Sequence, residues 1–97
     1  SLRIDIVGPD TVKPTVPTNL AGTIQPNGDV VLTWTASTDN VGVTEYIVTR
    51  NSVEIARVPV PTATIPAPAP GSHYYQISAI DAAGNTSART PSLRIDI

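Results

Sequence analysis

The chain of 97 residues contains no cysteine, methionine or phenylalanine, and its only aromatic residues are one tryptophan and three tyrosines. Without cysteine there is no disulfide framework, no thiol nucleophile and no cysteine-ligated metal. Charged residues make up 14% of the chain, and the formal net charge is −2. No three basic residues are adjacent. The basic stripe typical of nucleic-acid-binding proteins is therefore missing.

Long apolar runs are also lacking. No run approaches the roughly 18–20 residues that a membrane span needs. Arg3 and Asp5 interrupt the first residues, which excludes the apolar core of a signal peptide there. Ten prolines are spread along the sequence and argue against any long helix. We expect no membrane span, no nucleic-acid partner and little helix.

β-Branched residues are abundant, because about a third of the chain is Val, Ile or Thr. Such residues suit the half-buried surface of a pleated sheet. Val30, Leu32 and Trp34 alternate with Val31 and Thr33, which is the period of a strand. Similar patterns predict strands over residues 20–24, 29–36, 43–50, 53–58, 62–65, 72–81 and 86–97, the last interrupted at Pro91. Prolines around 62–65 place that strand at a sheet edge.

Turn signals separate these segments. Asn27-Gly28 is a strong hairpin signal, Asn51-Ser52 reverses the chain again, and residues 81–85 form a further turn. Seven short strands without a helical period predict an all-β fold, a seven-stranded antiparallel β-sandwich. The residues expected to face its core are Leu32, Trp34, Tyr46, Val48, Tyr75 and Ile77. Arg50 lies on the same strand face as Tyr46 and Val48.

Several motifs together resemble a fibronectin type III domain of the bacterial kind. They are Leu32-Thr33-Trp34, residues 37–43, Tyr46 with Val48, Pro70-Gly71-Ser72 and residues 79–87. The resemblance covers residues 14–97 and implies an immunoglobulin-like topology with Trp34 in the core. The family's tyrosine-corner position falls on His73 or on Tyr74, and Pro68 stands where a core leucine is common.

Candidate catalytic groups are few. His73 is the only histidine, and the chain has neither a nucleophile elbow nor the further ligands that a zinc site needs. Glu45 and Glu54 are the only glutamates, and a glycosidase would require a facing pair of carboxylates. We expect both on solvated strand surfaces. The sequence predicts no enzymatic activity and no cofactor.

Two loops carry the candidate interaction residues Asp39, Asn40, Asp81 and Asn85. In the expected fold, the loops at 37–42 and 81–85 emerge at the same end of the sandwich. Their side-chain oxygens could hold Ca²⁺, contact a carbohydrate or a cell-surface protein, or bond their own backbone. Because Asp and Asn in turns routinely bond their own backbone, we favour turn stabilisation and predict no metal site.

A hexapeptide is duplicated. The sequence Ser-Leu-Arg-Ile-Asp-Ile begins at positions 1 and 92, a spacing of 91 residues. That period suits one sandwich with its linker, so residues 1–6 can be the last strand of a preceding repeat or an N-terminal tail. Residues 7–13 are then a proline-containing linker before the domain at 14–97. An engineered duplication is the alternative, and residues 1–6 could also support strand-swapped self-association.

These observations favour a non-catalytic spacer module of an exported, multidomain bacterial protein, as one unit of a tandem array. Its partners would be neighbouring domains or repeats of the same chain, and its location secreted or on the cell surface. One alternative is an accessory module of a secreted polysaccharide-degrading enzyme. Others are an adhesin that uses the loops at 37–42 and 81–85, and a phage structural protein.

Overall fold

The computed structural model describes residues 13–39 and 42–97, and this part of the chain forms seven strands and no helix. The strands are β1 (Thr18–Ile24), β2 (Val30–Thr35), β3 (Val43–Arg50), β4 (Val53–Val58), β5 (Thr62–Ile65), β6 (Ser72–Asp81) and β7 (Leu93–Asp96). All pair antiparallel, in two sheets. The predicted seven-stranded antiparallel sandwich is confirmed.

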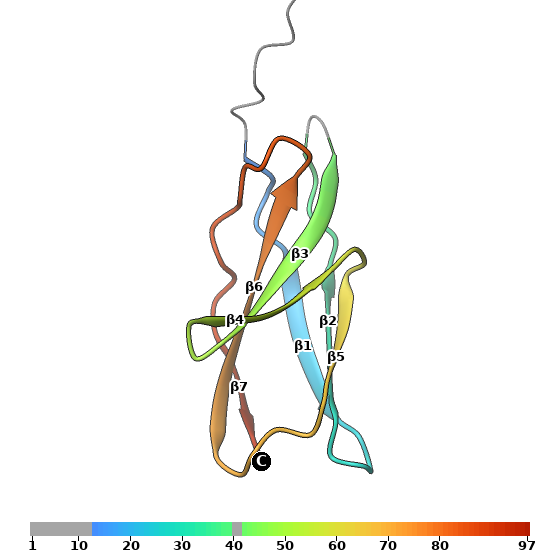
Figure 1. Ribbon diagram of the computed structural model, residues 1–97, viewed down its shortest axis with the longest axis vertical. Coiled ribbons are helices and arrows are strands. Elements are labelled where there is room, and N and C mark those ends of the chain that lie inside the picture. The colour runs from blue at the N-terminus through green and yellow to red at the C-terminus, as the bar shows by residue number, and fades with distance from the viewer. Residues whose placement is uncertain (1–12, 40–41) are drawn as a thin grey trace, which may run out of the picture.

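The two sheets have different sizes. One contains three strands in the order β1-β2-β5, and the other contains four in the order β4-β3-β6-β7. Figure 1 shows the sheets facing one another along the length of the molecule. β5 lies at an edge, as the surrounding prolines predict, because proline lacks the N–H that an interior strand donates.

The core lies between the sheets and follows the alternation of the strands. On β2, Val30, Leu32 and Trp34 are buried while Thr33 and Thr35 are exposed. The six residues expected in the core, Leu32, Trp34, Tyr46, Val48, Tyr75 and Ile77, are all buried. Trp34 packs edge-on against Tyr46 across the sandwich, with ring centroids 5.4 Å apart and planes at 67°. Such aromatic pairs add to the free energy gained from burial alone.

The hairpin between β3 and β4 turns on two residues with positive φ, Asn51 at 51° and Ser52 at 68°. Paired positive angles match the twist of flanking strands, and asparagine tolerates them well. Asn51 also ties the turn to β6, because its Oδ1 accepts the N–H of Tyr74 at 3.0 Å and its own N–H donates to the Tyr74 carbonyl at 2.9 Å. These two hydrogen bonds to β6 hold the turn in place, although its second position is a serine with positive φ.

The last strand is shorter than the sequence predicts. The expected strand over 86–97 is confined to Leu93–Asp96, with a single isolated bridge at Thr86. In between, side chains replace part of the backbone ladder: the N–H of Ala79 donates to Ser87 Oγ at 2.9 Å and the N–H of Ile77 to Thr90 Oγ1 at 3.0 Å. Because hydroxyl side chains compete with regular pairing, this segment departs from strand geometry.

β1 crosses close to β7 at Gly22. A Cβ at that position would lie 2.9 Å from Cδ1 of Ile95 and 3.2 Å from Cδ2 of Leu93. Only glycine fits so close an approach without a shift of its neighbours. The edge strands β1 and β7 of the two sheets are thereby in contact at this point.

The described chain enters the sandwich at the end where the β2–β3 loop lies. Pro14 and Pro17 are buried, the N–H of Thr15 donates to the Thr38 carbonyl at 2.9 Å, and Thr15 Oγ1 accepts the N–H of Thr38. The chain ends at the opposite end of the molecule (Figure 1). The predicted segment 1–6, and all of the predicted linker at 7–13 except Lys13, lie outside the described residues.

Candidate functional site

The loops that carry the candidate interaction residues lie at one end of the sandwich. Val43, which begins β3 after the β2–β3 loop, pairs with Asp81, which ends β6 before the β6–β7 loop. Thr44 reinforces this junction, because its hydroxyl donates to the Ile80 carbonyl at 3.2 Å. The register of β3 against β6 therefore sets the two loops side by side.

Asp81 is buried, with 2% of its surface exposed, and organises the β6–β7 turn. Its Oδ1 accepts the N–H groups of Ala83 and Asn85, each at 2.9 Å, and its Oδ2 accepts Nδ2 of Asn85 at 3.0 Å. Its own N–H donates to the Asn85 carbonyl at 3.0 Å. The structure thus brings Asp81 and Asn85 together, with both carboxylate oxygens engaged in the turn.

Asp39 has a similar local role in the other loop. Its Oδ2 accepts the N–H of Gly42 at 3.1 Å, which spans the loop. Asn40 lies outside the described residues. Within residues 13–39 and 42–97, no group of three or more His, Cys, Asp or Glu side chains is placed to hold a metal ion. Among the described residues, Asp39, Asp81 and Asn85 all form hydrogen bonds within their own turns.

His73 occupies the corner position where the chain enters β6. Its Nε2 lies 2.7 Å from the carbonyl of Ala69, four residues upstream, and its ring packs beside Tyr75 at 6.3 Å between centroids. A tyrosine corner makes the same kind of upstream bond through its hydroxyl. Tyr74, the other candidate for this position, is 43% exposed. His73 therefore acts as a structural brace at this corner.

The two glutamates lie on β3 and β4. Glu54 forms a bidentate ion pair with Arg57, at 3.1 Å for both bonds. This hydrogen-bonded guanidinium lowers the pKa of the exposed Glu54 carboxyl from its ordinary value. General acid catalysis in a glycosidase needs a carboxyl with a raised pKa, so Glu54 does not match that role.

The aromatic side chains offer little surface for stacking on a sugar. Trp34, Tyr46 and Tyr75 are buried in the core, and Tyr74 is the exposed member of the four. The hydroxyl of Tyr46 has a structural task, since it accepts the N–H of Ser37 at 3.0 Å and so holds the start of the β2–β3 loop. Trp34 is therefore a core residue and not a stacking platform.

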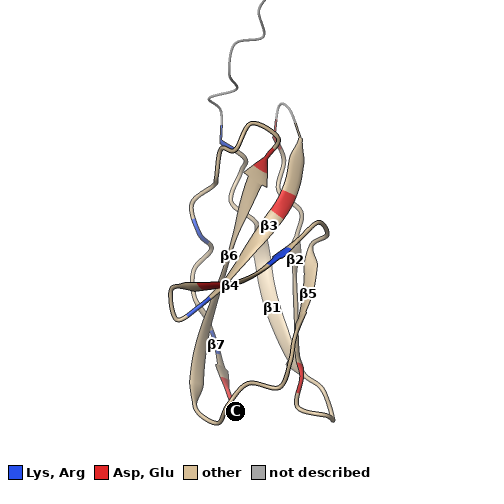
Figure 2. Cartoon of the chain, viewed as in Figure 1, with Lys and Arg blue, Asp and Glu red and all other residues tan. Residues whose placement is uncertain are grey.

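The charged residues of the described chain lie in the four-stranded sheet and in loops. Figure 2 shows basic and acidic positions interspersed there, without a basic stripe, whereas β1, β2 and β5 carry no charged residue. In the described part of the chain, no helix is long and apolar enough to cross a membrane. The interspersed charge does not favour a nucleic-acid partner.

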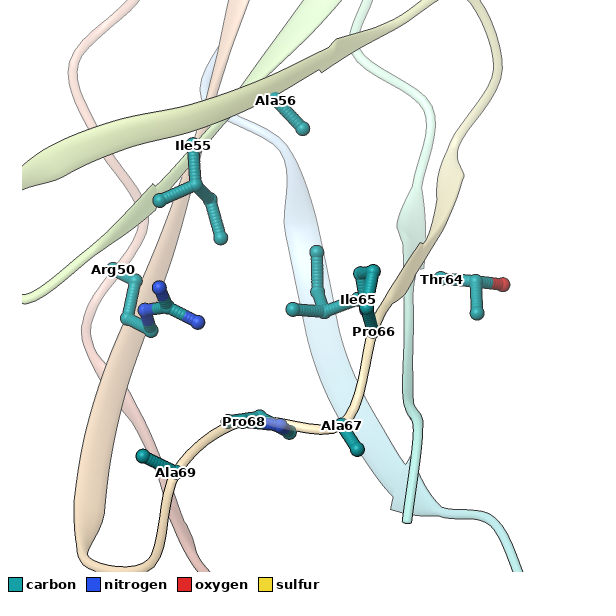
Figure 3. A pocket seen from close by; sticks show the side chains of 9 residues that line it. All are labelled: Arg50, Ile55, Ala56, Thr64, Ile65, Pro66, Ala67, Pro68 and Ala69. Carbon is teal, nitrogen blue, oxygen red and sulfur yellow. The ribbon is translucent and has the colours of Figure 1, made fainter. Parts of the chain in front are cut away.

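One charged side chain was not recognised as a candidate from sequence. Arg50, at the end of β3, is half-buried and lines an open cleft between the sheets together with residues of β4, β5 and the segment that follows β5 (Figure 3). The sequence held a signal, because Arg50 shares the inward strand face with Tyr46 and Val48. A charge on an inward face marks a site that needs an explanation.

Comparisons with known proteins agree on a modular origin. The chain is 46% identical over 89 residues to chitinase A1 of Niallia circulans and 41% identical over 88 residues to chitinase Chi52 of Paenibacillus xylanexedens. It is 36% identical over 88 residues to exoglucanase B of Cellulomonas fimi. The matches cover 90–91% of this chain but only 13%, 17% and 8% of those three proteins.

Solved structures give the same result. The chitinase ChiA74 of Bacillus thuringiensis contains a region that superposes with a TM-score of 0.80 at 40% identity, covering 90% of this chain and 14% of that one. The central fibronectin-III array of RIM-binding protein superposes with a TM-score of 0.71 at 19% identity, covering 91% and 36%, and so supports the fold. No model of a known protein family matches the sequence. Topology, core and relatives together identify the chain as a fibronectin type III domain of the bacterial kind.

Proposed function

We propose that the chain is a non-catalytic accessory module of a polysaccharide-degrading enzyme. The observation that carries this proposal is the coverage. About nine tenths of this chain matches chitinase A1, chitinase Chi52 and chitinase D of Niallia circulans, but the match takes up at most 17% of the length of each. The remaining length of such relatives leaves room for catalytic domains. The two glutamates of this chain lie on different strands, β3 and β4, and the Glu54 carboxylate is held in a bidentate pair with Arg57.

The mechanism is mechanical. The described chain enters the sandwich at one end and leaves at the other (Figure 1), so the module adds its own length between the domains that it joins. The Thr15–Thr38 bonds and the buried Pro14 and Pro17 fix the direction of entry. A fixed entry limits bending, which a flexible linker of the same length would allow.

The same proposal includes a location outside the cell. Chitin and glucans are polymers, and an enzyme that degrades them meets its substrate where the polymer lies. A Thr-rich, cysteine-free sandwich has no need of disulfide formation in that setting. The partners of the module are then the neighbouring domains of its own chain.

Deleting this module from the full-length protein tests the proposal. Hydrolysis of a soluble oligosaccharide should be unchanged, whereas hydrolysis of the insoluble polymer should fall several-fold because the catalytic domain is no longer held at its working distance. Loss of activity on the soluble substrate would contradict a non-catalytic role. Unchanged activity on both substrates would contradict a role in polymer degradation.

A tandem array is a second candidate, supported by the duplicated hexapeptide. In the structure, the copy at 92–97 provides all of β7, so the copy at 1–6 carries the sequence of a complete last strand. We propose that the parent protein repeats this module with a period of 91 residues. Residues 1–6 would also have the side chains needed to take the β7 position in another copy.

Light scattering tests strand exchange directly. The 97-residue chain should form concentration-dependent dimers or longer assemblies, and a chain that lacks residues 1–6 should remain a monomer. Identical monomers in both cases would overturn strand exchange. Sequencing of the flanking coding region tests the array itself, because another copy at the same period must follow or precede this one.

A further inference from the structure

The cleft that contains Arg50 lies on the side of the sandwich where β4 and β5 form the two sheet edges. Its volume is about 360 Å³, and its walls are mostly aliphatic: Ile55 and Ala56 of β4, Ile65 of β5, and Pro66 and Pro68 beyond it. Figure 3 shows these side chains around an open space, with the Arg50 guanidinium directed into it. The short side chains of this wall leave the space unfilled.

Arg50 has no acidic partner among the described residues. The ion pairs of that part of the chain are Arg57 with Glu54 and Arg94 with Asp96. The nearest end of the β1–β2 hairpin carries Asp29, but its carboxylate already accepts the N–H of Ala67 at 2.9 Å and Nδ2 of Asn27 at 3.1 Å. A half-buried guanidinium against aliphatic walls is therefore left uncompensated.

The cleft fits a carboxylate more closely than a neutral sugar. A guanidinium presents a planar fork of donors that matches a carboxylate in bidentate geometry. Besides Arg50, Thr64 is the only lining residue with a polar side chain, and no aromatic ring lines the cleft. A sugar bound there would leave most of its hydroxyl groups without hydrogen-bond partners. A ligand whose carboxylate is flanked by aliphatic side chains would not, because those side chains need no such partners and can pack against the aliphatic walls.

We propose that this cleft binds a short extended peptide in which an aspartate or glutamate is flanked by aliphatic residues, supplied by the linker to a neighbouring domain. The carboxylate pairs with Arg50, and the flanking side chains cover Ile55, Ile65 and Pro68. The identity of the partner as a linker rests on the proposed accessory function. Such a contact would add rigidity to the junction with the neighbour, beyond the spacing that the length of the module supplies.

Peptide titration tests the site. The probe is the capped peptide acetyl-Val-Ile-Asp-Val-Pro-amide, followed by amide shifts in NMR spectra of the 97-residue chain. All test chains carry Asp5→Asn and Asp10→Asn, so that the carboxylates of the first twelve residues cannot compete. Shifts should concentrate at the residues lining the cleft, and binding should weaken several-fold between low and high salt. The matched peptide with asparagine in place of aspartate should bind at least tenfold more weakly.

Two variants separate the site from general charge. Arg50→Gln should weaken binding of the aspartate peptide at least tenfold, while Arg89→Gln, which removes the same charge from an exposed position, should change it less than twofold. Glucuronate is the comparison for a sugar carboxylate and should bind more weakly than the peptide. Equal binding of the two peptides, or equal effects of the two variants, would overturn the proposal, and so would tighter binding of glucuronate.

The comparison of the aspartate peptide with the asparagine peptide uses a chain that retains Arg50. The test therefore stands even if Arg50→Gln impairs folding. Failure of this titration would leave the deletion experiment on the parent enzyme unaffected. Conversely, peptide binding by a module whose deletion changes nothing would uphold the site and reject the linker as its source.

Discussion

Asp81 illustrates at the scale of one residue how this fold uses its few charges. The carboxylate is buried, yet three donors of the β6–β7 turn satisfy it. A turn of this kind can be recognised from the sequence, because the pattern Asp-x-x-Gly-Asn combines a turn-forming aspartate with a glycine that readily adopts positive φ. The sequence pointed to these residues, but only the structure shows that their oxygens are turned inward to the loop itself.

Replacing Asp81 with alanine should therefore destabilise the fold. Three donors lose their acceptor in a buried setting, and we expect a loss of about 2–3 kcal/mol in the free energy of unfolding. Asp81→Asn should lose less, because its Oδ1 still accepts the two backbone N–H groups. Urea denaturation measures both. A midpoint for Asp81→Ala equal to that of the unmodified chain would contradict the role assigned to this side chain.

Tyr75 leads to the opposite expectation. Its ring is fully buried, but its hydroxyl has no hydrogen-bond partner among the described residues. Removing an unsatisfied buried hydroxyl removes a desolvation cost, so Tyr75→Phe should be neutral or more stable by up to about 1 kcal/mol. Thermal denaturation followed by circular dichroism provides the measurement. A clear loss of stability would show that the hydroxyl has a partner that this account lacks.

At the scale of the element, most of the sheet could be predicted from sequence and one segment could not. Period-two alternation located the strands from β1 to β6 to within a few residues, because each buries one face. Residues 86–92 contain β-branched and polar residues that also suit a strand. In the structure, however, side-chain hydroxyls of this segment accept N–H groups of β6 that a paired strand would bond through its backbone carbonyls. The residue pattern does not distinguish these two kinds of hydrogen-bond acceptor.

Thr90 tests that explanation. Its Oγ1 accepts the Ile77 N–H at 3.0 Å, and the residue is 2% exposed. Thr90→Val keeps the shape but leaves a buried N–H without an acceptor, which should cost about 1–3 kcal/mol in unfolding free energy. Thr33→Val, on the exposed face of β2, is the matched control and should change stability by less than about 0.5 kcal/mol. Equal effects of the two substitutions would exclude a stabilising hydrogen bond from the β6 backbone to the Thr90 hydroxyl.

The pairing of β6 with β7 should respond to acid. Ser72 and Arg94 both donate to Asp96 Oδ1, at 2.7 and 2.8 Å, and these bonds lower the pKa of the Asp96 carboxyl below its ordinary value of 3.8. A carboxyl whose pKa is lowered by folding contributes stability above its unfolded-state pKa and loses it as the pH falls through the folded-state value.

Asp96→Asn should accordingly lower the denaturation midpoint at pH 7, and the difference from the unmodified chain should shrink once the pH falls well below the ordinary value of 3.8. The effect should be small, because both side chains of the Arg94–Asp96 pair are exposed. Chemical denaturation at the two pH values measures it. A difference that grows in acid would have the wrong sign for a lowered pKa.

At the scale of the whole molecule, the sequence could predict the fold and the absence of catalytic motifs, since both follow from local patterns. The open cleft beside Arg50 could not be predicted. It depends on how β4, β5 and the proline-rich segment after β5 are spaced across the two sheets, and sequence alternation fixes only which face a residue occupies. Binding surfaces on this module therefore require the three-dimensional arrangement.

The central claim is that the module acts through its length and rigidity and not through chemistry of its own. The most direct measurement replaces residues 13–97 in the full-length protein with an unrelated β-sandwich of similar length, and in parallel with a flexible Gly/Ser linker, and compares hydrolysis of the insoluble polymer. We predict that the unrelated sandwich retains most of the activity and that the flexible linker does not. Loss of activity with both replacements would contradict the claim, because it would show that a specific surface of this module is required.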